Sequence, residues 1–409
     1  MKLISRLLSV FTLLAGVGAM TNGVYAQTDS ATKINIAEVV VIHSKILNED
    51  RRLYIYTPAT VPNFSTPTGP YPVMYMFDGE FQIQMVAGLV DYLSKVQREL
   101  PPMIVVGIDN NHYDREHDLT PTHSDKADPV SKPDTSPTSV TRTSGGGENF
   151  LRFIHEEVMP YVEQHYSTTP FKVLSGHSLG GLLSTYTLVS HPDMFNAYIA
   201  ISPSVWWDDA ALFKEAEAKT VANAYKNKYL FLSISSEGGE FYKDIQDINS
   251  LFQTRANLSG LSYRYAYYPE ENHGSGPAKA EYDALKFVFA GYLPSPKDST
   301  PALIEQFNER FRSHFGYSAP PLDENTLLVF AYNELEDPNK VGEAIELFKM
   351  AVKYYPASSN AFDSLGDGYA KSGNKLLAID AYRHAIELHS SDYTEVSKSK
   401  LDALVSTKK

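Results

Sequence analysis

Cysteine is absent from all 409 residues. Without thiols the chain forms no disulfide, no thiolate metal site, no iron–sulfur cluster and no cysteine nucleophile. A strongly basic segment is also missing, since 36 Lys and Arg stand against 49 Asp and Glu and the net charge is −13. Nucleic acid is therefore not an expected partner. With 43% hydrophobic and 21% charged residues, the composition is that of a globular protein, which excludes wholesale disorder and a multi-span membrane protein.

The first 26 residues have the pattern of a secretory signal peptide. Lys2 and Arg6 form a positive start, Leu7 to Val17 is mostly apolar and too short to span a bilayer, and Ala26 ends a cleavage pattern. A retained membrane anchor is the alternative. Such a peptide would direct export of the chain across the inner membrane and be removed after Ala26, and a secreted chain without cysteine fits a bacterial periplasm. The mature chain would then have no membrane span.

From residue 35 the chain alternates β-rich runs with helical patterns. Several runs are continuously apolar, such as Met103-Ile104-Val105-Val106, which is typical of strands buried on both faces of a parallel sheet. Strands connected by helices predict an α/β fold with an eight-stranded, mostly parallel sheet. The predicted strands are Asn35–His43, Arg51–Thr57, Val73–Asp78, Met103–Asp109, Phe171–Gly176, Ala197–Ser202, Tyr229–Ser235 and Ser262–Pro269.

Two segments interrupt this alternation. Residues 110–148 are polar and rich in Thr, Ser and Pro, so they are either a mobile loop over the active site or an inert excursion of the surface. Residues 35–295 would form the α/β domain and 296–324 a linker.

The C-terminal part contains a repeat. The run Ala344 to Val352 recurs at Ala378 to Ile386, an offset of 34 residues, and Leu365-Gly366 fits the opening of a tetratricopeptide unit. Residues 325–409 are therefore predicted as a small tetratricopeptide-like, all-α domain. Two units leave apolar surface uncovered, so we expect packing on the α/β domain, a protein partner or a second copy of the chain.

The candidate nucleophile is Ser178. Gly176-His177-Ser178-Leu179-Gly180 lies between an apolar strand and a helical run, which is the context of a nucleophile elbow. Gly176 and Gly180 leave room for the sharp turn that raises the serine hydroxyl above the sheet. A tight turn without catalysis is the alternative. His177 is expected to point away and pack.

A base and an acid must follow the nucleophile along the chain. His273, on the loop beyond the last predicted strand, is the candidate base. Glu237, on the loop after the seventh strand, is the candidate acid, with Glu240 and Asp244 as alternatives. A backbone oxyanion hole is expected from the N–H groups of Leu179 and Glu80.

Other residues are candidates for the substrate pocket. Trp206 and Trp207, the 2 tryptophans of the chain, wall the pocket or pack in the core. Arg115 binds an anionic substrate or pairs with Asp118 to fix its loop. His112, His117 and His123 are close in sequence, but their spacing on a polar loop does not predict a metal site, and no cofactor is expected.

Four motifs together resemble the esterase family of α/β-hydrolases, which includes siderophore esterases of the enterobactin and bacillibactin type, esterase D and feruloyl esterases. They are Tyr-Pro-Val-Met-Tyr-Met-Phe-Asp-Gly at 71–79, Gly-His-Ser-Leu-Gly-Gly at 176–181, Ser-Pro-Ser-Val-Trp-Trp at 202–207 and Glu-Asn-His-Gly-Ser at 271–275.

The resemblance implies the α/β-hydrolase fold and Ser–His ester hydrolysis of a small molecule. Some relatives are Ser–His dyads, so the role of Glu237 stays open. A siderophore ester, a carbohydrate acyl or feruloyl ester, and acyl transfer to a sugar are the alternative reactions. The alternative from another class is a tetratricopeptide interaction protein on an inert hydrolase platform.

Overall fold

Eight strands form one sheet in the order β1-β2-β4-β3-β5-β6-β7-β8. Strand β2 is antiparallel to β1 and β4, and the other neighbouring pairs are parallel, which confirms the predicted fold class. The computed structural model describes residues 35–58, 70–125, 144–292, 300–316, 322–388 and 394–406. The strands are β1 (Glu38–Ser44), β2 (Glu49–Tyr56), β3 (Tyr71–Met76), β4 (Ile104–Ile108), β5 (Thr168–His177), β6 (Ala197–Ile201), β7 (Tyr229–Ile234) and β8 (Ser262–Tyr267).

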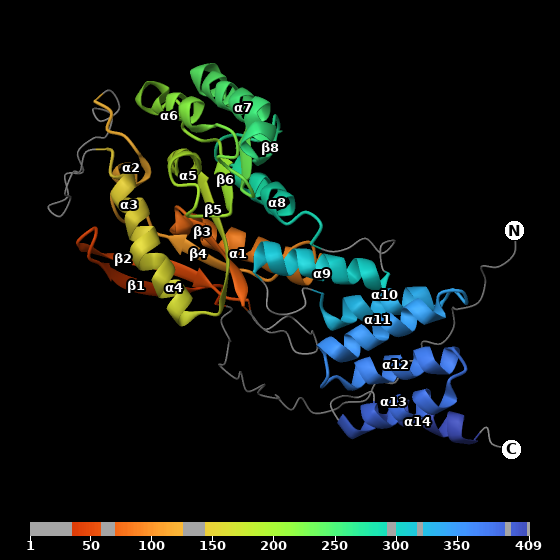
Figure 1. Ribbon diagram of the computed structural model, residues 1–409. Helices are drawn as coiled ribbons and strands as arrows, with labels where there is room; N and C mark the ends of the chain where they lie inside the picture. The colour runs from red at the N-terminus through yellow and green to blue at the C-terminus, as the bar shows by residue number, and fades with distance from the viewer. Residues whose placement is uncertain are drawn as a thin grey trace, which may run out of the picture. The chain divides into compact units, whose positions relative to one another are not determined.

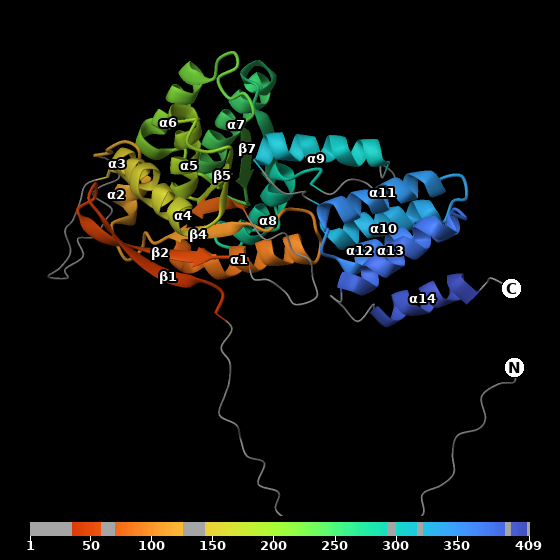
Figure 2. The same cartoon turned by 60° about the horizontal axis from the view of Figure 1, so that its bottom comes forward.

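Helices cover both faces of this sheet (Figures 1 and 2). Alternate residues of the central strands feed two separate cores because successive side chains of a strand point to opposite faces. On β3, for example, Met74 belongs to one core and Tyr75 to the other. The first core contains α1 (Gly79–Lys95) and α8 (Gly276–Val288). The second contains α3 (Gly147–Phe153), η2 (Ile154–Val158), α4 (Met159–His165), α5 (Leu179–Ser190), α6 (Trp207–Lys219) and α7 (Gly239–Ser259).

Two glycines bring the start of α1 against β4. A Cβ atom on Gly79 would lie 2.4 Å from the carbonyl carbon of Gly107, and one on Gly107 would lie 2.8 Å from the Cα of Gly79. Real Cβ atoms do not approach that closely, so both positions require glycine. This contact fixes the N-terminus of α1 at the carboxyl end of the sheet, beside the predicted nucleophile elbow.

The segment predicted as a linker contains a packed helix. Helix α9 (Pro301–Phe315) begins after Thr300, whose side chain accepts a hydrogen bond from the N–H of Leu303. Its Phe315 ring packs against Phe171 of β5 at 4.6 Å between ring centroids and against Phe289 at 5.3 Å. The α/β core therefore continues beyond residue 295. Helix α9, in the segment predicted as a linker, thus packs on the α/β domain.

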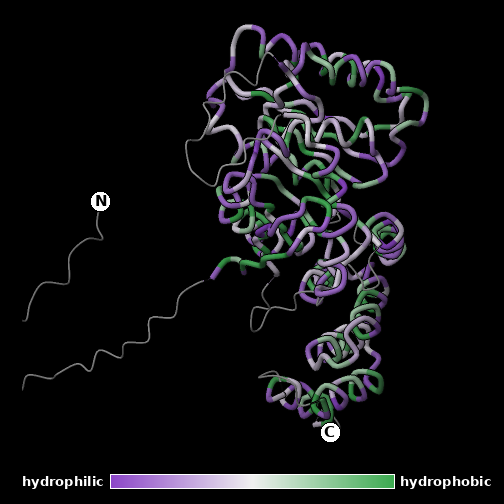
Figure 3. The backbone as a smooth tube through the Cα atoms, turned by 90° about the vertical axis from the view of Figure 1, so that its left-hand side faces the viewer, coloured by the Kyte–Doolittle hydropathy of each residue, from purple (hydrophilic) through white to green (hydrophobic). Residues whose placement is uncertain are grey.

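Five helices follow: α10 (Glu324–Leu335), α11 (Val341–Tyr354), α12 (Ser359–Lys371), α13 (Lys375–Leu388) and α14 (Thr394–Ser406). Their hydropathy alternates between hydrophobic and hydrophilic stretches along each helix (Figure 3), as amphipathic helices require. A Cβ atom on Gly366 of α12 would lie 2.4 Å from the ring of Tyr382 on α13, so the glycine permits close helix packing.

The 34-residue offset is repeated in the burial of these helices. The buried positions of α11 are Ala344, Leu347, Phe348 and Ala351, and those of α13 are Ala378, Ala381, Tyr382 and Ala385. The tetratricopeptide assignment itself stays a prediction. Arg98, which follows α1, donates to the hydroxyl of Thr326 on α10 at 2.8 Å and so adds a second contact with the α/β part.

Truncation should separate the contribution of α9 from that of the later helices. A chain that ends at Tyr292 leaves Phe171 and Phe289 without α9, and exposing these two rings costs about 4 kcal/mol at about 2 kcal/mol each. We expect this chain to unfold at a clearly lower urea midpoint and to aggregate, whereas a chain that ends at Gly316 keeps these contacts and more of the stability. Equal midpoints for both truncated chains would contradict the role of α9.

Candidate active site

Ser178 lies in a strained turn between β5 and α5. Its φ and ψ are 61° and −118°, which non-glycine residues rarely adopt. A Cβ atom on Gly176 would lie 2.2 Å from the carbonyl oxygen of Gly180, so the turn closes only with glycine there. The Ser178 N–H donates to the carbonyl of Ile201 on β6 at 3.0 Å. This is the geometry that a nucleophile elbow requires, as the sequence predicts.

Ser204 is a neighbour of the nucleophile that the sequence did not single out. Its hydroxyl lies 3.3 Å from the Ser178 hydroxyl, and its N–H donates to the Ser178 carbonyl at 3.1 Å. Ser204 belongs to the Ser-Pro-Ser-Val-Trp-Trp motif, which contained the signal. The Ser178 hydroxyl thus has a hydroxyl partner at hydrogen-bond distance.

The candidate base and acid form a hydrogen-bonded pair. The Nδ1 atom of His273, on the loop between β8 and α8, lies 2.9 Å from Oε1 of Glu237, on the loop between β7 and α7. This bond leaves Nε2 of His273 as the nitrogen that could accept a proton. The Glu237 side chain is 11% exposed, and the alternatives Glu240 and Asp244 lie further on, in α7.

Hydrogen bonds keep Glu237 ionised. Burial alone would raise the pKa of Glu237, but hydrogen bonds from Ser202 and His273 outweigh it and lower the pKa below its ordinary value. A carboxylate that stays charged is suited to orient an imidazole and to stabilise the imidazolium.

His177 packs against the base. Its ring centroid lies 4.4 Å from that of His273, with 45° between the ring planes. Burial, and next the neighbouring His273, lower the pKa of His177 to about 4. Sequence reasoning expected this residue only to pack away from the site, because nothing in the local pattern shows that the last loop of the domain returns to cover it.

The predicted oxyanion donors stand at two helix starts. Leu179 is the first residue of α5, and Glu80 is the second of α1. The first N–H groups of a helix have no acceptor one turn earlier, so both remain suited to bind an oxyanion. The Glu80 carboxylate turns instead to the next loop, where it accepts from the N–H of Asn111 at 2.8 Å.

A cleft of about 580 Å³ adjoins this constellation. It is lined by the start of α1, the loop after β4 and the start of α8. The lining residues are Asp78, Phe81, Gln82, Met85, Asn111, Arg115, His177, Gly274, Ser275, Pro277 and Ala278. The cleft therefore opens beside His273 and contains one cationic side chain, Arg115.

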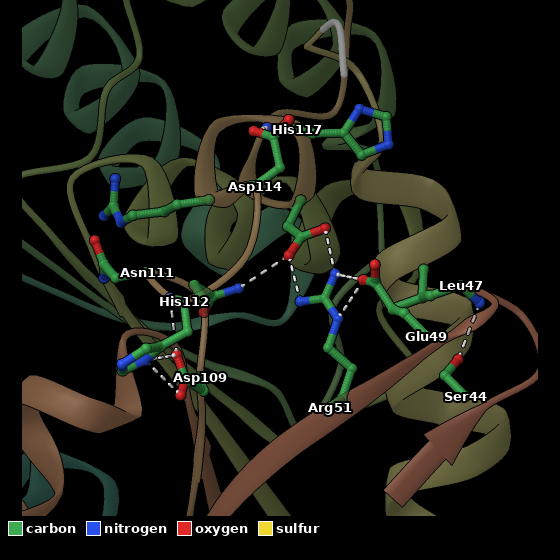
Figure 4. A network of polar contacts seen from close by, with 12 residues as sticks. Ser44, Leu47, Glu49, Arg51, Asp109, Asn111, His112, Asp114 and His117 are labelled. Atoms are coloured by element: carbon green, nitrogen blue, oxygen red, sulfur yellow. Dashed lines mark hydrogen bonds and ion pairs between the residues drawn. The ribbon is translucent and has the colours of Figure 1, made fainter. Parts of the chain in front are cut away.

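The predicted pairing of Arg115 with Asp118 is wrong. Arg115 forms two hydrogen bonds with Asp78, from Nε at 2.6 Å and from Nη2 at 2.8 Å. Asp118 instead pairs with Arg51 of β2, whose Nη1 lies 2.6 Å from Oδ2 (Figure 4). Both members of the second pair are buried. A distant strand thus supplies the cation that pairs with Asp118, a role that sequence proximity had assigned to Arg115.

The Arg51–Asp118 pair anchors helix α2 (Arg115–Leu119) to the sheet. Arg51 also pairs with Glu49 at 2.5 Å (Figure 4). Breaking a buried pair by removing one partner leaves an uncompensated charge, so this network holds α2 in place. Arg115, at the first residue of α2, is thereby held at the cleft. The middle of the polar segment, residues 126–143, lies outside the described residues, and its gating role stays a prediction.

The two tryptophans have different environments. Trp207 is buried, and its Nε1 donates to the carbonyl of Thr122 at 2.9 Å, so it packs in the core and fastens the polar segment. Trp206 is 41% exposed. Neither residue lines the 580 Å³ cleft.

The three candidate histidines do not form a metal site. Nδ1 of His112 lies 2.9 Å from a carboxylate oxygen of Asp109, and Nε2 of His123 lies 2.9 Å from one of Asp125. Throughout the described ranges, no group of three or more His, Cys, Asp or Glu side chains could hold a metal ion. Among the same residues, no helix is both long enough and apolar enough to cross a membrane.

Comparison with known proteins identifies the family of the chain. A family model described as "Putative esterase" matches residues 44–273, more than half of the chain. The chain belongs to this esterase family. The match begins at the end of β1 and ends at His273, so it contains the elbow, Glu237 and the cleft's cationic residue Arg115.

Similar proteins include enzymes named for siderophores. Ferri-bacillibactin esterase BesA of Bacillus subtilis (strain 168) is 28% identical over 283 residues, which are 66% of this chain and 93% of the relative. The crystal structure of an IroE-like serine hydrolase from Shewanella oneidensis is 26% identical and covers 76% of this esterase-family chain and 98% of its own, with a TM-score of 0.64.

The fold has a counterpart over most of the chain as well. A protein from Capnocytophaga ochracea DSM 7271 is 18% identical and has a TM-score of 0.61; it covers 90% of this chain and 99% of its own. Coverage of that extent includes helices after α9, so the combination of the sheet with C-terminal helices occurs in a second protein.

Glu237→Gln tests the acid of this esterase-family chain. The amide keeps the size of the side chain but removes the charge that would stabilise an imidazolium, so we expect kcat on p-nitrophenyl acetate to fall by about a hundredfold to ten-thousandfold. Because hydrogen bonds hold the pKa of Glu237 low, this carboxylate should stay ionised between pH 5 and 8, and its protonation should not reduce wild-type activity in that range. Glu240→Gln is the matched control. A loss of activity in Glu240→Gln but not in Glu237→Gln would identify Glu240 as the acid instead.

Proposed function

We propose that this protein is a serine esterase that hydrolyses a carboxylic ester through Ser178, His273 and Glu237. The observation that carries the proposal is the strained serine elbow together with the 2.9 Å His273–Glu237 pair. Nε2 of His273 accepts the proton of the Ser178 hydroxyl as Oγ attacks the ester carbonyl carbon. Glu237 orients the imidazole and stabilises its charged form.

The tetrahedral oxyanion is held by the N–H groups of Leu179 and Glu80. When the intermediate collapses, the C–O bond to the alcohol breaks, and His273 gives its proton to the leaving oxygen. Water then attacks the acyl-enzyme, transfers its proton to His273, and releases the acid while the proton returns to Ser178. Every atom in this cycle comes from the ester, water and the chain.

We further propose a siderophore ester as the substrate. The support is the similarity to proteins named Ferri-bacillibactin esterase and Siderophore enterobactin esterase, the latter 40% identical over 105 residues, which are 25% of this chain and 34% of the relative. The cleft beside His273 is large enough for part of such a molecule and carries both a cationic and several apolar side chains.

The experiment is hydrolysis of enterobactin and bacillibactin, each with and without iron, followed by liquid chromatography and mass spectrometry. Appearance of the linear and monomeric acids with wild-type protein, but not with Ser178→Ala, supports the substrate. Turnover of p-nitrophenyl and feruloyl esters with no siderophore product would keep the esterase mechanism and overturn the siderophore assignment. Addition of sugar alcohols would reveal acyl transfer by the formation of new esters.

We also propose export with cleavage after Ala26, and a tetratricopeptide pair in α10–α13. The segment up to Ala26 lies outside the described residues, so the proposal rests on its sequence pattern. Mass spectrometry of the N-terminal peptide from a periplasmic fraction tests it: a mature chain that starts at Gln27 supports cleavage, and an intact Met1 overturns it.

A further inference from the structure

His177 is the one ionisable side chain of the elbow, and it faces the candidate base. The His177 ring lies against the His273 ring at 4.4 Å between centroids. The ring of Phe241 on α7 contacts the His273 ring edge-on, at 5.6 Å between centroids and 89° between planes. Glu237 holds the Nδ1 atom at 2.9 Å. Three side chains from three segments thus surround the His273 imidazole, which stands on a loop and has no secondary structure of its own to fix it.

The charged groups near His177 each have a hydrogen-bond partner other than His177. Arg115 of α2 is bound to Asp78 at the start of α1, and its Nη2 approaches the His177 carbonyl at 3.5 Å. Glu237 is bound to His273. On the loop that carries the base, Glu271 accepts from the hydroxyl of Ser275 at 2.5 Å.

His177 is neutral in these surroundings. Its Nε2 atom is buried and has no hydrogen-bond partner among the described residues, and burial, followed by the neighbouring His273, lowers the pKa of His177 to about 4. A second imidazolium at 4.4 Å from a protonated base would be repelled in this partly dry site. The ring is therefore an uncharged surface over the whole range in which an esterase base works.

We propose that His177 is a positioning residue for His273: its neutral ring packs against the imidazole of the base and holds it against Glu237. The proposal rests on the proposed esterase function and adds a role that the Ser–His–acid scheme lacks. Without this neighbour, an imidazole on a loop would lose the fixed orientation that proton transfer from the nucleophile requires.

Two variants test this role. His177→Ala removes the ring that packs against His273. We expect kcat on p-nitrophenyl acetate to fall by about tenfold while KM changes by less than about twofold, because the misplaced base weakens chemistry more than binding. His177→Phe restores a flat neutral ring and should return kcat close to wild type.

The outcomes separate the proposal from its rivals. An equal loss of rate in His177→Ala and His177→Phe would mean that His177 is only part of the core, and the proposal would fail. Full activity in His177→Ala would also overturn it. His155→Ala, on the exposed side of η2, controls for loss of a histidine. Wild-type activity that survives in Ser178→Ala would instead refute the esterase mechanism itself.

Discussion

Ser178→Ala is expected to lower kcat for p-nitrophenyl acetate by about a millionfold, to a residual rate that only binding and the oxyanion donors support. The reason is that no other hydroxyl takes the place of Oγ: the neighbouring Ser204 is 3.3 Å away and is not on the elbow. Initial rates at saturating ester, followed by absorbance of the phenolate, measure the effect. A fluorophosphonate probe should label the wild-type chain and not the variant.

Ser204→Ala is the matched control, since it removes a hydroxyl from the same site. We expect a loss of less than about tenfold, because Ser204 would position the nucleophile and not attack. Ser178 has a positive φ, and alanine at this position would meet the same backbone strain. We therefore expect the melting temperature of Ser178→Ala to stay close to that of the wild type. Retained activity in Ser178→Ala would show that Ser178 is not the nucleophile, and probe labelling at Ser204 would identify Ser204 as the nucleophile instead.

Patterns confined to one element were readable from the sequence. All eight strands were predicted, because an apolar run between polar turns indicates a buried strand without any information on the neighbouring strands. The elbow was readable for the same reason, since Gly176 and Gly180 act within one turn. The order of nucleophile, acid and base along the chain predicted Glu237 and His273 on two separate loops, and the structure brings these two side chains within 2.9 Å of each other.

Contacts between elements were less readable. Arg115 and Asp118 are three residues apart and of opposite charge, which favoured a local pair, but Arg51 from a distant strand holds Asp118. Helix α9 was missed, and its segment was assigned as a linker, although Ile304, Phe307, Phe311 and Phe315 recur at helical spacing. The approach of His177 to His273 depends on how the last loop closes over the elbow, and no spacing between them records it.

His273→Ala should lower kcat by nearly as much as loss of the nucleophile, about a hundred-thousandfold to a millionfold, because the serine hydroxyl without its base is a poor nucleophile. The wild-type rate should fall at acidic pH, since an imidazolium cannot accept the Ser178 proton. The residual rate of the variant should lose this acid limb, and pH–rate profiles from 5 to 9 test both statements. His177→Ala, whose ring lies 4.4 Å away, is the control for removing an imidazole from the site and should keep an acid limb. A variant that retains the wild-type limb would show that another group accepts the proton, and Glu237 would then have no base to orient.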